Sequence, residues 1–198
     1  MGLKVFAWNM QRGSSILPSK SASKEEREKA GARLRLLSAL CNDHDLGFIT
    51  EAGADLTQAV SAPNTTNVLV PKGMGWWHAA WKEDTQHDSK GCKNLLFFKG
   101  GAIDKYDLNI LSGKVTSCRY PAAAAALVEG KRALFASIHA TSGGGGRANM
   151  EVFMDYVDEL PERKKPELVV FGGDLNSSSS QFIQPKQPTH QGGYICSL

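Results

Sequence analysis

The sequence predicts a single α/β domain over residues 1–198. Apolar runs of strand length recur along the chain, and several of them end in a polar residue. Two longer segments instead repeat apolar residues with the period of an amphipathic helix. The chain has 198 residues, of which 41% are hydrophobic and 22% charged, so it is large and apolar enough for one ordinary globular core.

A strand and a helix are predicted near the amino terminus. Residues 3–8 form a mostly apolar run that leads to Asn9. After a polar loop, Ser23 and Glu26 have the three-residue spacing of a capping box, which marks the start of a helix. Apolar residues then recur on one side of this helix, at Ala30, Leu34, Leu37 and Cys41. Because the other side carries several Lys and Arg residues, we expect a surface helix that lies on a sheet.

Two further strands are predicted before residue 71. The first is the apolar run 46–49, which leads to Glu51, and the second is the run 68–70. A tryptophan cluster follows at Trp76, Trp77 and Trp81. We interpret this cluster as core or as cover for a sheet, with base stacking as the alternative.

The middle of the chain predicts a strand at 94–98 and loosely alternating hairpin residues at 102–118. A tight turn at 129–131 then joins two predicted strands, at 121–128 and 132–138. The first of these two strands is rich in alanine, which favours helices by propensity. We nevertheless predict a strand packed under a helix, because Pro121 precedes the alanines and the tight turn follows them. Small residues in such a strand would let the layers approach closely.

The last predicted elements are a helix and a buried strand. Apolar residues recur with helical spacing at Met150, Phe153, Met154, Val157 and Leu160. A charged segment at 162–165, interpreted as a solvated loop, leads to the wholly apolar run 168–171. A run of this kind is typical of a strand buried on both faces.

Four of the predicted strands lead to polar side chains suited to metal or phosphate chemistry. They are Asn9, Glu51, His139 and the pair Asp174 and Asn176. Because alternate residues of an extended chain point the same way, we expect Asp174 and Asn176 to face one cleft. Each position alone has a structural explanation: a turn, a helix cap, a buried imidazole and an Asx turn. Their recurrence at strand ends, where α/β folds build their sites, favours an active site.

The motifs around these residues resemble those of the endonuclease/exonuclease/phosphatase superfamily, which has the DNase I-like fold. They are Trp8-Asn9-Met10-Gln11, Thr50-Glu51-Ala52-Gly53, Ser137-Ile138-His139-Ala140 and Gly172-Gly173-Asp174-Leu175-Asn176. Within the superfamily the sequence is most similar to B subunits of cytolethal distending toxin. These also have an Arg-Pro-like segment ahead of the His strand, here Arg119-Tyr120-Pro121. The resemblance covers residues 3–198.

The resemblance implies a sandwich of two packed, mostly antiparallel sheets flanked by helices. It also implies an enzyme, a Mg²⁺- or Mn²⁺-dependent hydrolase that nicks DNA. A hard cation with oxygen ligands stabilises the charge that develops on a phosphodiester during hydrolysis. By this resemblance Glu51 and Asn9 bind the metal.

The remaining site residues are expected to act on the phosphate and the attacking water. His139 donates to the phosphate or to the leaving oxygen, and Asp174 orients or deprotonates the water. Asn176 holds a phosphate oxygen. Arg119 binds a non-bridging oxygen through its guanidinium fork.

The sequence departs from the family at its end. The family has a final strand with a Ser-Asp-His segment, whereas this sequence stops at Leu198 without one. Thr189, Gly192 and Gly193 resemble the residues just before that strand. The expectations are therefore missing last strands, weakened catalysis and an open sheet edge beside strand 168–171, which a dimer or partner chain would cover.

Two alternative functions stay open on the sequence. One is a phosphoinositide phosphatase, because members of this fold differ in their surface loops. The other is a catalytically impaired remnant that only binds nucleic acid or a partner protein. The net charge of +3 is a weak indication of a polyanionic partner.

Composition also bears on location. No run of about 18 apolar residues predicts a membrane span. The four cysteines are widely spaced and form no CxxC pair, which favours reduced thiols in a cytosol-like compartment. No secretory signal is visible, so a cytoplasmic location is expected, with export as a toxin-like protein as the alternative.

Overall fold

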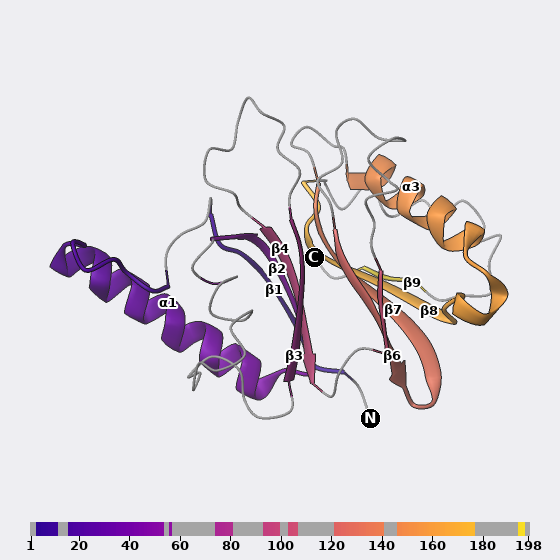
Figure 1. Cartoon of the computed structure of the whole chain (residues 1–198), viewed down its shortest axis with the longest axis horizontal. Coiled ribbons are helices and arrows are strands. Elements are labelled where there is room, and N and C mark those ends of the chain that lie inside the picture. Colours follow the sequence, from indigo (N-terminus) through magenta and orange to yellow (C-terminus); the bar gives the residue numbers. More distant parts are fainter. Residues whose placement is uncertain are drawn as a thin grey trace.

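The computed structural model describes residues 3–11, 16–53, 56, 74–80, 93–99, 103–106, 121–140, 146–176 and 194–196. These residues form a mixed α/β structure with two sheets and flanking helices. The sheets lie face to face, with one long helix on each outer side, so that four layers follow one another across the molecule (Figure 1).

The first sheet has the strand order β1-β2-β4-β3 among the described residues. Its strands are β1 (Val5–Asn9), β2 (Leu46–Ala52), β3 (Met74–Ala80) and β4 (Lys93–Lys99). β1 pairs with β2 in parallel, whereas β4 pairs with both β2 and β3 in antiparallel fashion.

The second sheet has the order β5-β6-β7-β8-β9. Its strands are β5 (Asp104–Tyr106), β6 (Ala122–Val128), β7 (Lys131–His139), β8 (Leu168–Asp174) and β9 (Tyr194–Cys196). β5, β6 and β7 pair in antiparallel fashion, while β7, β8 and β9 pair in parallel. The two sheets together are therefore mixed, and antiparallel pairings are only slightly in the majority among the described strands.

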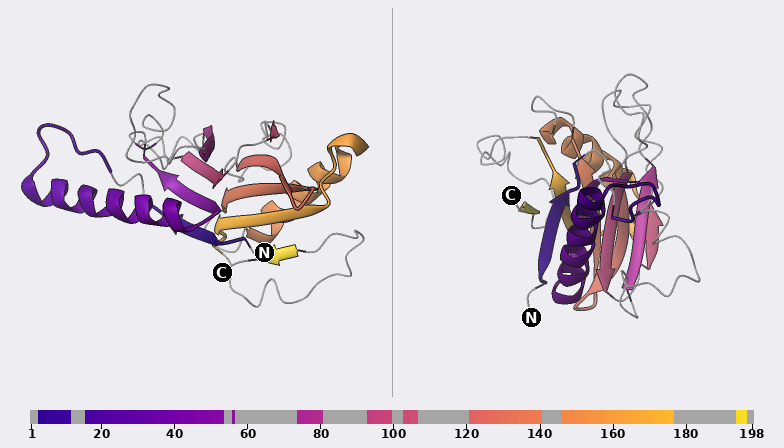
Figure 2. Two further views of the ribbon diagram at one scale, coloured as in Figure 1. Left: turned by 90° about the horizontal axis from the view of Figure 1, so that it is seen from below. Right: turned by 90° about the vertical axis from the view of Figure 1, so that its left-hand side faces the viewer.

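The helices cover the outer faces of the sheets. α1 (Lys24–Asp43) packs on the first sheet and α3 (Gly146–Glu159) on the second; a 3-10 turn, η2 (Glu162–Lys164), follows α3 (Figures 1 and 2). The predicted capping box is confirmed, since the Ser23 hydroxyl accepts from the Glu26 N–H and the Glu26 carboxylate accepts from the Ser23 N–H. Neither helix has an apolar stretch long enough to cross a membrane.

Alternation along the strands divides the core between the layers. On β4, Leu95 and Phe97 pack under α1, while Leu96 and Phe98 face the second sheet. The alanines of β6 divide in the same way. Ala123 and Ala125 pack with α3, and the core between the sheets contains Ala122, Ala124 and Ala126. The predicted strand under a helix is therefore confirmed, with the sheet-to-sheet contact as an added reason for small residues.

Close approach of the sheets near one end depends on a glycine. A Cβ at Gly172 of β8 would lie 2.1 Å from the ring of Phe48 on β2. Nearby, the buried Ser137 hydroxyl donates to the carbonyl of Ile49 at 3.1 Å and ties β7 to β2. The two sheets are thus held together just below the strand ends that carry the predicted site.

Three sequence predictions need correction. The segment 74–80, predicted only as part of a tryptophan cluster, is strand β3. The strand predicted at 68–70 is not among these corrections, since it lies outside the described residues. The segment 162–164 is a 3-10 turn, not a loop. The prediction of an open edge beside strand 168–171 is wrong for 169–171, because β9 pairs with these residues in parallel. A partner chain is not needed to cover the edge there.

Candidate metal centre

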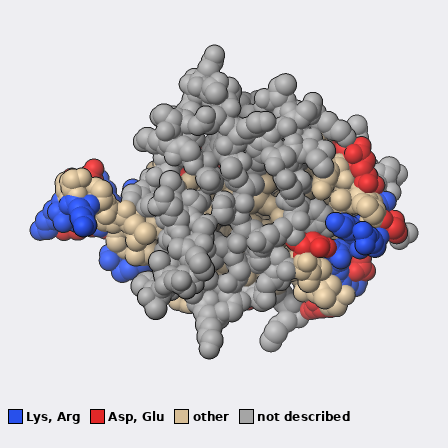
Figure 3. Space-filling view, in the orientation of Figure 1, with Lys and Arg blue, Asp and Glu red and all other residues tan. Residues whose placement is uncertain are grey.

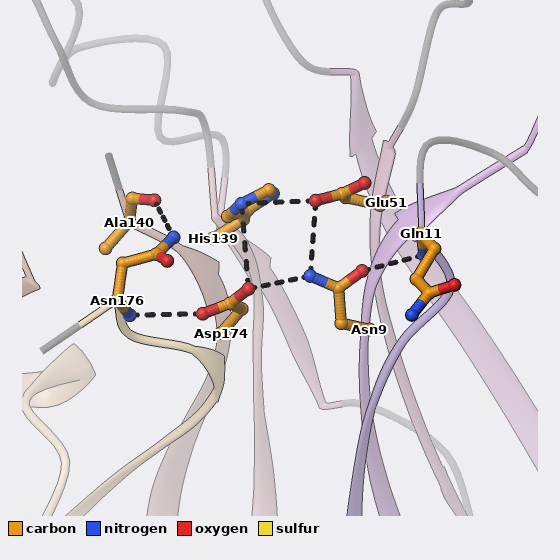
Figure 4. Close-up of polar contacts among 7 residues, drawn as sticks. All are labelled: Asn9, Gln11, Glu51, His139, Ala140, Asp174 and Asn176. Carbon is orange, nitrogen blue, oxygen red and sulfur yellow. Dashed lines mark hydrogen bonds and ion pairs between the residues drawn. The ribbon is translucent and has the colours of Figure 1, made fainter. Parts of the chain in front are cut away.

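The candidate site lies where two parallel strand pairs end. β1 and β2 end in one sheet, with Asn9 beside Thr50, and β7 and β8 end in the other, with His139 beside Asp174. Parallel neighbours place their carboxyl ends at the same edge of a sheet. Because the sheets are packed face to face, polar side chains from all four strands meet between them (Figure 4).

A β-bulge directs Glu51 into the site. The pairing of β2 with β4 shifts between Ile49 and Ala52, and Glu51 has a left-handed backbone with φ of 54°. Bulges commonly re-aim a side chain next to a functional site. The Glu51 side chain is 15% exposed, and its Oε1 lies 3.5 Å from Nε2 of His139.

His139 is the most buried member of the site, with a side chain only 3% exposed. Its Nε2 faces two carboxylates, at 3.5 Å from Glu51 Oε1 and 4.0 Å from Asp174 Oδ2. Both distances are longer than a normal hydrogen bond. His139 Nε2 therefore lies near both carboxylates without a normal hydrogen bond to either of these oxygens.

Asn9 bridges the two carboxylates. Its Nδ2 donates to Asp174 Oδ2 at 2.7 Å and to Glu51 Oε1 at 3.2 Å, while its Oδ1 accepts from the backbone N–H of Gln11 at 2.8 Å. In this arrangement the amide oxygen, which is the atom that could ligate a cation, points away from the carboxylates (Figure 4). Asn9 thus holds Glu51 and Asp174 together with its NH₂ group.

Asp174 and Asn176 form the Asx turn that was the structural alternative for this pair. The Asn176 N–H donates to Asp174 Oδ1 at 3.1 Å, and Asn176 has a left-handed φ of 44°. Its side-chain Nδ2 donates to the carbonyl of Ala140 at 2.8 Å. The prediction that both side chains face one cleft was wrong, because the chain turns after Asp174 and is no longer extended.

The turn depends on the glycine before Asp174. Gly173 has φ of 119°, a conformation that residues with a side chain rarely adopt. A Cβ there would lie 2.3 Å from the carbonyl oxygen of Ile138. The glycine therefore lets β8 run close to β7 at the point where Asp174 enters the site.

Glu51, His139 and Asp174 could hold a metal ion, and we call these three residues the metal centre. One ligand atom from each lies within 4.8 Å of the others. Two carboxylates brought together repel each other, and a cation between them removes that repulsion. Two oxygen ligands and one imidazole nitrogen suit several divalent ions, so the donor set does not identify one.

The structure thus brings together most of the predicted site residues. Asn9, Glu51, His139 and Asp174 converge, and Asn176 lies beside them with its amide on Ala140. Arg119 lies outside the described residues.

Two contributions were not predicted from the sequence. The Gln11 N–H fixes the orientation of Asn9. The motif Trp8-Asn9-Met10-Gln11 contains Gln11, but no function was predicted for it. The Ser137 hydroxyl crosses between the sheets beneath the site. A serine within an otherwise apolar strand was the available signal for the second.

Comparison with known proteins adds no relative. A scan against protein-family models finds no match to the chain, and no curated protein sequence matches it. Any functional conclusion therefore depends on the sequence motifs and on the geometry of the site.

Proposed function

We propose that this protein is a divalent-metal-dependent phosphodiesterase with a DNase I-like fold, and that its substrate is DNA. The observation that carries the proposal is the convergence of Glu51, His139 and Asp174 from strand ends of both sheets. Two facing sheets with a helix outside each are consistent with the sandwich that the motifs imply.

The residues of the site fit a cation that assists phosphodiester hydrolysis. Glu51 and Asp174 would hold Mg²⁺ or Mn²⁺, which when bound supplies positive charge to the phosphate oxygens. Asn9 keeps both carboxylates in position, because its Nδ2 donates to each of them. A loss of either hydrogen bond would let the carboxylates separate.

His139 is proposed as the proton donor. A protonated imidazole that is 3% exposed and faces two carboxylates is oriented and shielded from water. It can donate to a phosphate oxygen or to the leaving oxygen as negative charge develops there. Asp174, 29% exposed, is placed to accept a hydrogen bond from an attacking water.

Asn176 is given a different role from the one the sequence suggested. Its N–H and its side-chain amide both form hydrogen bonds within the protein, to Asp174 and Ala140. We propose that it positions Asp174 and does not itself bind phosphate. The substitution Asn176→Ala would then act mainly through Asp174.

The test compares two substrates under the same conditions. Nicking of supercoiled plasmid and phosphate release from a soluble phosphoinositide are measured with Mg²⁺, with Mn²⁺ and with EDTA. We expect metal-dependent nicking that EDTA abolishes and little phosphate release. Full nicking activity in EDTA would contradict the metal-dependent mechanism. Phosphate release without nicking would instead identify a phosphatase, and the absence of both activities would contradict the proposed enzymatic function.

A matched variant pair attributes the activity to this chain. Glu51→Gln removes one carboxylate from the metal centre, and Glu151→Gln makes the same change on the exposed side of α3. Only the first is expected to abolish nicking.

A further inference from the structure

A groove on α1 offers a second place for a polyanion. Its described lining consists of Lys24, Arg27, Glu28, Gly31 and Arg35. These positions are three or four residues apart, or adjacent, so they form one stripe along the helix. Three of them are cationic and one is anionic, so the groove has a net positive charge.

Gly31 forms the floor of the groove. A Cβ at this position would lie 3.4 Å from Nη1 of Arg35, so the guanidinium lies over the glycine. Glycine within a helix is less favourable than alanine. Here the missing side chain makes room for an arginine head group and for whatever it binds.

The cations of the groove are available for an external anion. Lys24 is 92% exposed and lies 3.9 Å from Glu28, a weak contact in solvent. Arg27 and Arg35 have no side-chain hydrogen bond or ion pair within the described part of the chain. Guanidinium groups bind phosphate through two parallel N–H donors.

The amino-terminal part of the groove, Lys24 to Glu28, is on the part of α1 that projects from the body of the protein. Residues 24–29 are all exposed, and burial of α1 on the first sheet begins at Ala30. Figure 2 shows the amino-terminal half of α1 projecting beyond the strands, and Figure 3 shows Lys and Arg side chains gathered at that end. The metal centre, in contrast, lies between the two sheets.

We propose that this groove binds backbone phosphates of the DNA whose hydrolysis we assign to the metal centre; the inference therefore rests on the proposed function. The stripe from Lys24 to Arg35 is about 16 Å long at 1.5 Å per residue. A DNA strand presents about five phosphates over that length. The groove thus adds contacts to a duplex that a small phosphodiester cannot make.

The lining favours a nucleic acid over a membrane surface. Helices that lie on membranes bury a broad apolar face beside their basic residues. No apolar side chain lines the described part of the groove, and the apolar side of α1, at Ala30, Leu37 and Cys41, is buried on the first sheet. The groove itself presents charge and hydrogen-bond donors, which suit a phosphate backbone.

The test removes the two arginines and compares large with small substrates. The variant is Arg27→Gln/Arg35→Gln, since glutamine preserves helix propensity. Its control is Lys131→Gln/Arg163→Gln, which removes the same charge from exposed positions outside α1. Binding to a fluorescein-labelled DNA duplex is followed by anisotropy in EDTA over a range of salt concentrations. Hydrolysis of bis(p-nitrophenyl) phosphate with Mn²⁺ is measured in parallel.

For the α1 variant we expect about tenfold weaker DNA binding, and a salt slope reduced by about one to two because each phosphate contact contributes about 0.9. Hydrolysis of the small diester should not change. Equal DNA binding by the two variants would overturn the inference about the groove. If the small diester is still hydrolysed in that case, the proposed function of the metal centre is upheld. Co-sedimentation with anionic lipid vesicles is measured for the same variants. Binding that depends on α1 for vesicles but not for DNA would likewise overturn the inference. If wild type does not hydrolyse the small diester, the proposed function itself is rejected.

Discussion

Three residues in or beside the metal centre have a left-handed backbone. They are Gln11, Glu51 and Asn176, with φ of 51°, 54° and 44°. Such conformations cost about 1–3 kcal/mol each and persist where the surrounding structure enforces them. Hydrogen bonds to Asn9 and Asp174 hold Gln11 and Asn176, and a bulge in β2 accommodates Glu51. The strained positions are those that aim or fix the polar side chains of the site.

The roles assigned to His139 and Asp174 are tested by substituting each alone. We expect His139→Gln and Asp174→Asn each to lower the turnover of plasmid nicking by about 10²-fold or more, because each removes a proton donor or an acceptor for water. Thermal unfolding by circular dichroism is measured for both. If either variant loses its cooperative transition, that residue has a structural role and its assignment here fails.

The residues of the site were predictable, but their orientations were not. Each predicted position follows an apolar run, and such strand ends are visible in a sequence. Asn9 was expected to offer an oxygen to the metal, but that oxygen accepts from the Gln11 N–H while the NH₂ group faces the two carboxylates. Asn176 was expected to face the cleft, but its φ of 44° ends the extended chain. One hydrogen bond decided the first case and one backbone angle the second, and periodicity carries no information about either.

At the scale of elements, local signals predicted the helices better than the strands. The capping box and the apolar spacing of α1, and the apolar spacing of α3, are encoded within short segments. Strand β9 has three residues and exists because β8 offers a neighbour. Strand β3 pairs along its whole length with β4. These two strands depend on pairing with distant residues, which explains why the sequence did not reveal them.

The capping box of α1 makes part of the stability depend on pH. Hydrogen bonds from the backbone and the side chain of Ser23 lower the pKa of Glu26 below its ordinary value of 4.5. The ionised carboxylate therefore stabilises the folded state above that value, and the contribution is lost as pH falls through the lowered pKa. In urea titrations, Glu26→Gln should be less stable than wild type at pH 7. The difference should shrink below about pH 4.5, and a constant difference at all pH values would contradict this explanation.

The packing of β8 on β2 is tested at Gly172. Gly172→Ala places a methyl group in the ring of Phe48, so the sheets must move apart. We expect a loss of about 1–3 kcal/mol in the free energy of unfolding, as for other overpacked cores. Gly31→Ala on α1 is the control and should be neutral or stabilising. Adding Phe48→Leu to Gly172→Ala should recover part of the loss, and no recovery would show that this ring is not the obstacle.

For the whole molecule, the main consequence of the fold is that the metal centre needs residues from both sheets. Glu51 comes from β2, while His139 and Asp174 come from β7 and β8. Glu51 and Asp174, the two proposed ligands, come from different sheets, so a cation that both of them hold binds only when the sheets are packed together. Binding to the folded state alone raises the free energy of unfolding in proportion to the logarithm of metal concentration. The melting temperature should thus keep rising with the logarithm of the Mn²⁺ concentration once that concentration exceeds the dissociation constant of the site.

The most direct test of this account is Mn²⁺ binding by wild type, Glu51→Gln and the exposed control Glu151→Gln. Free Mn²⁺ gives a sharp electron paramagnetic resonance spectrum that broadens when the ion binds, so the free concentration is measured directly. We predict a saturable site in wild type and Glu151→Gln that is lost, or weakened at least about tenfold, in Glu51→Gln, because a hard cation depends on its carboxylate ligands. Equal binding by Glu51→Gln and wild type would contradict the assignment of the metal centre.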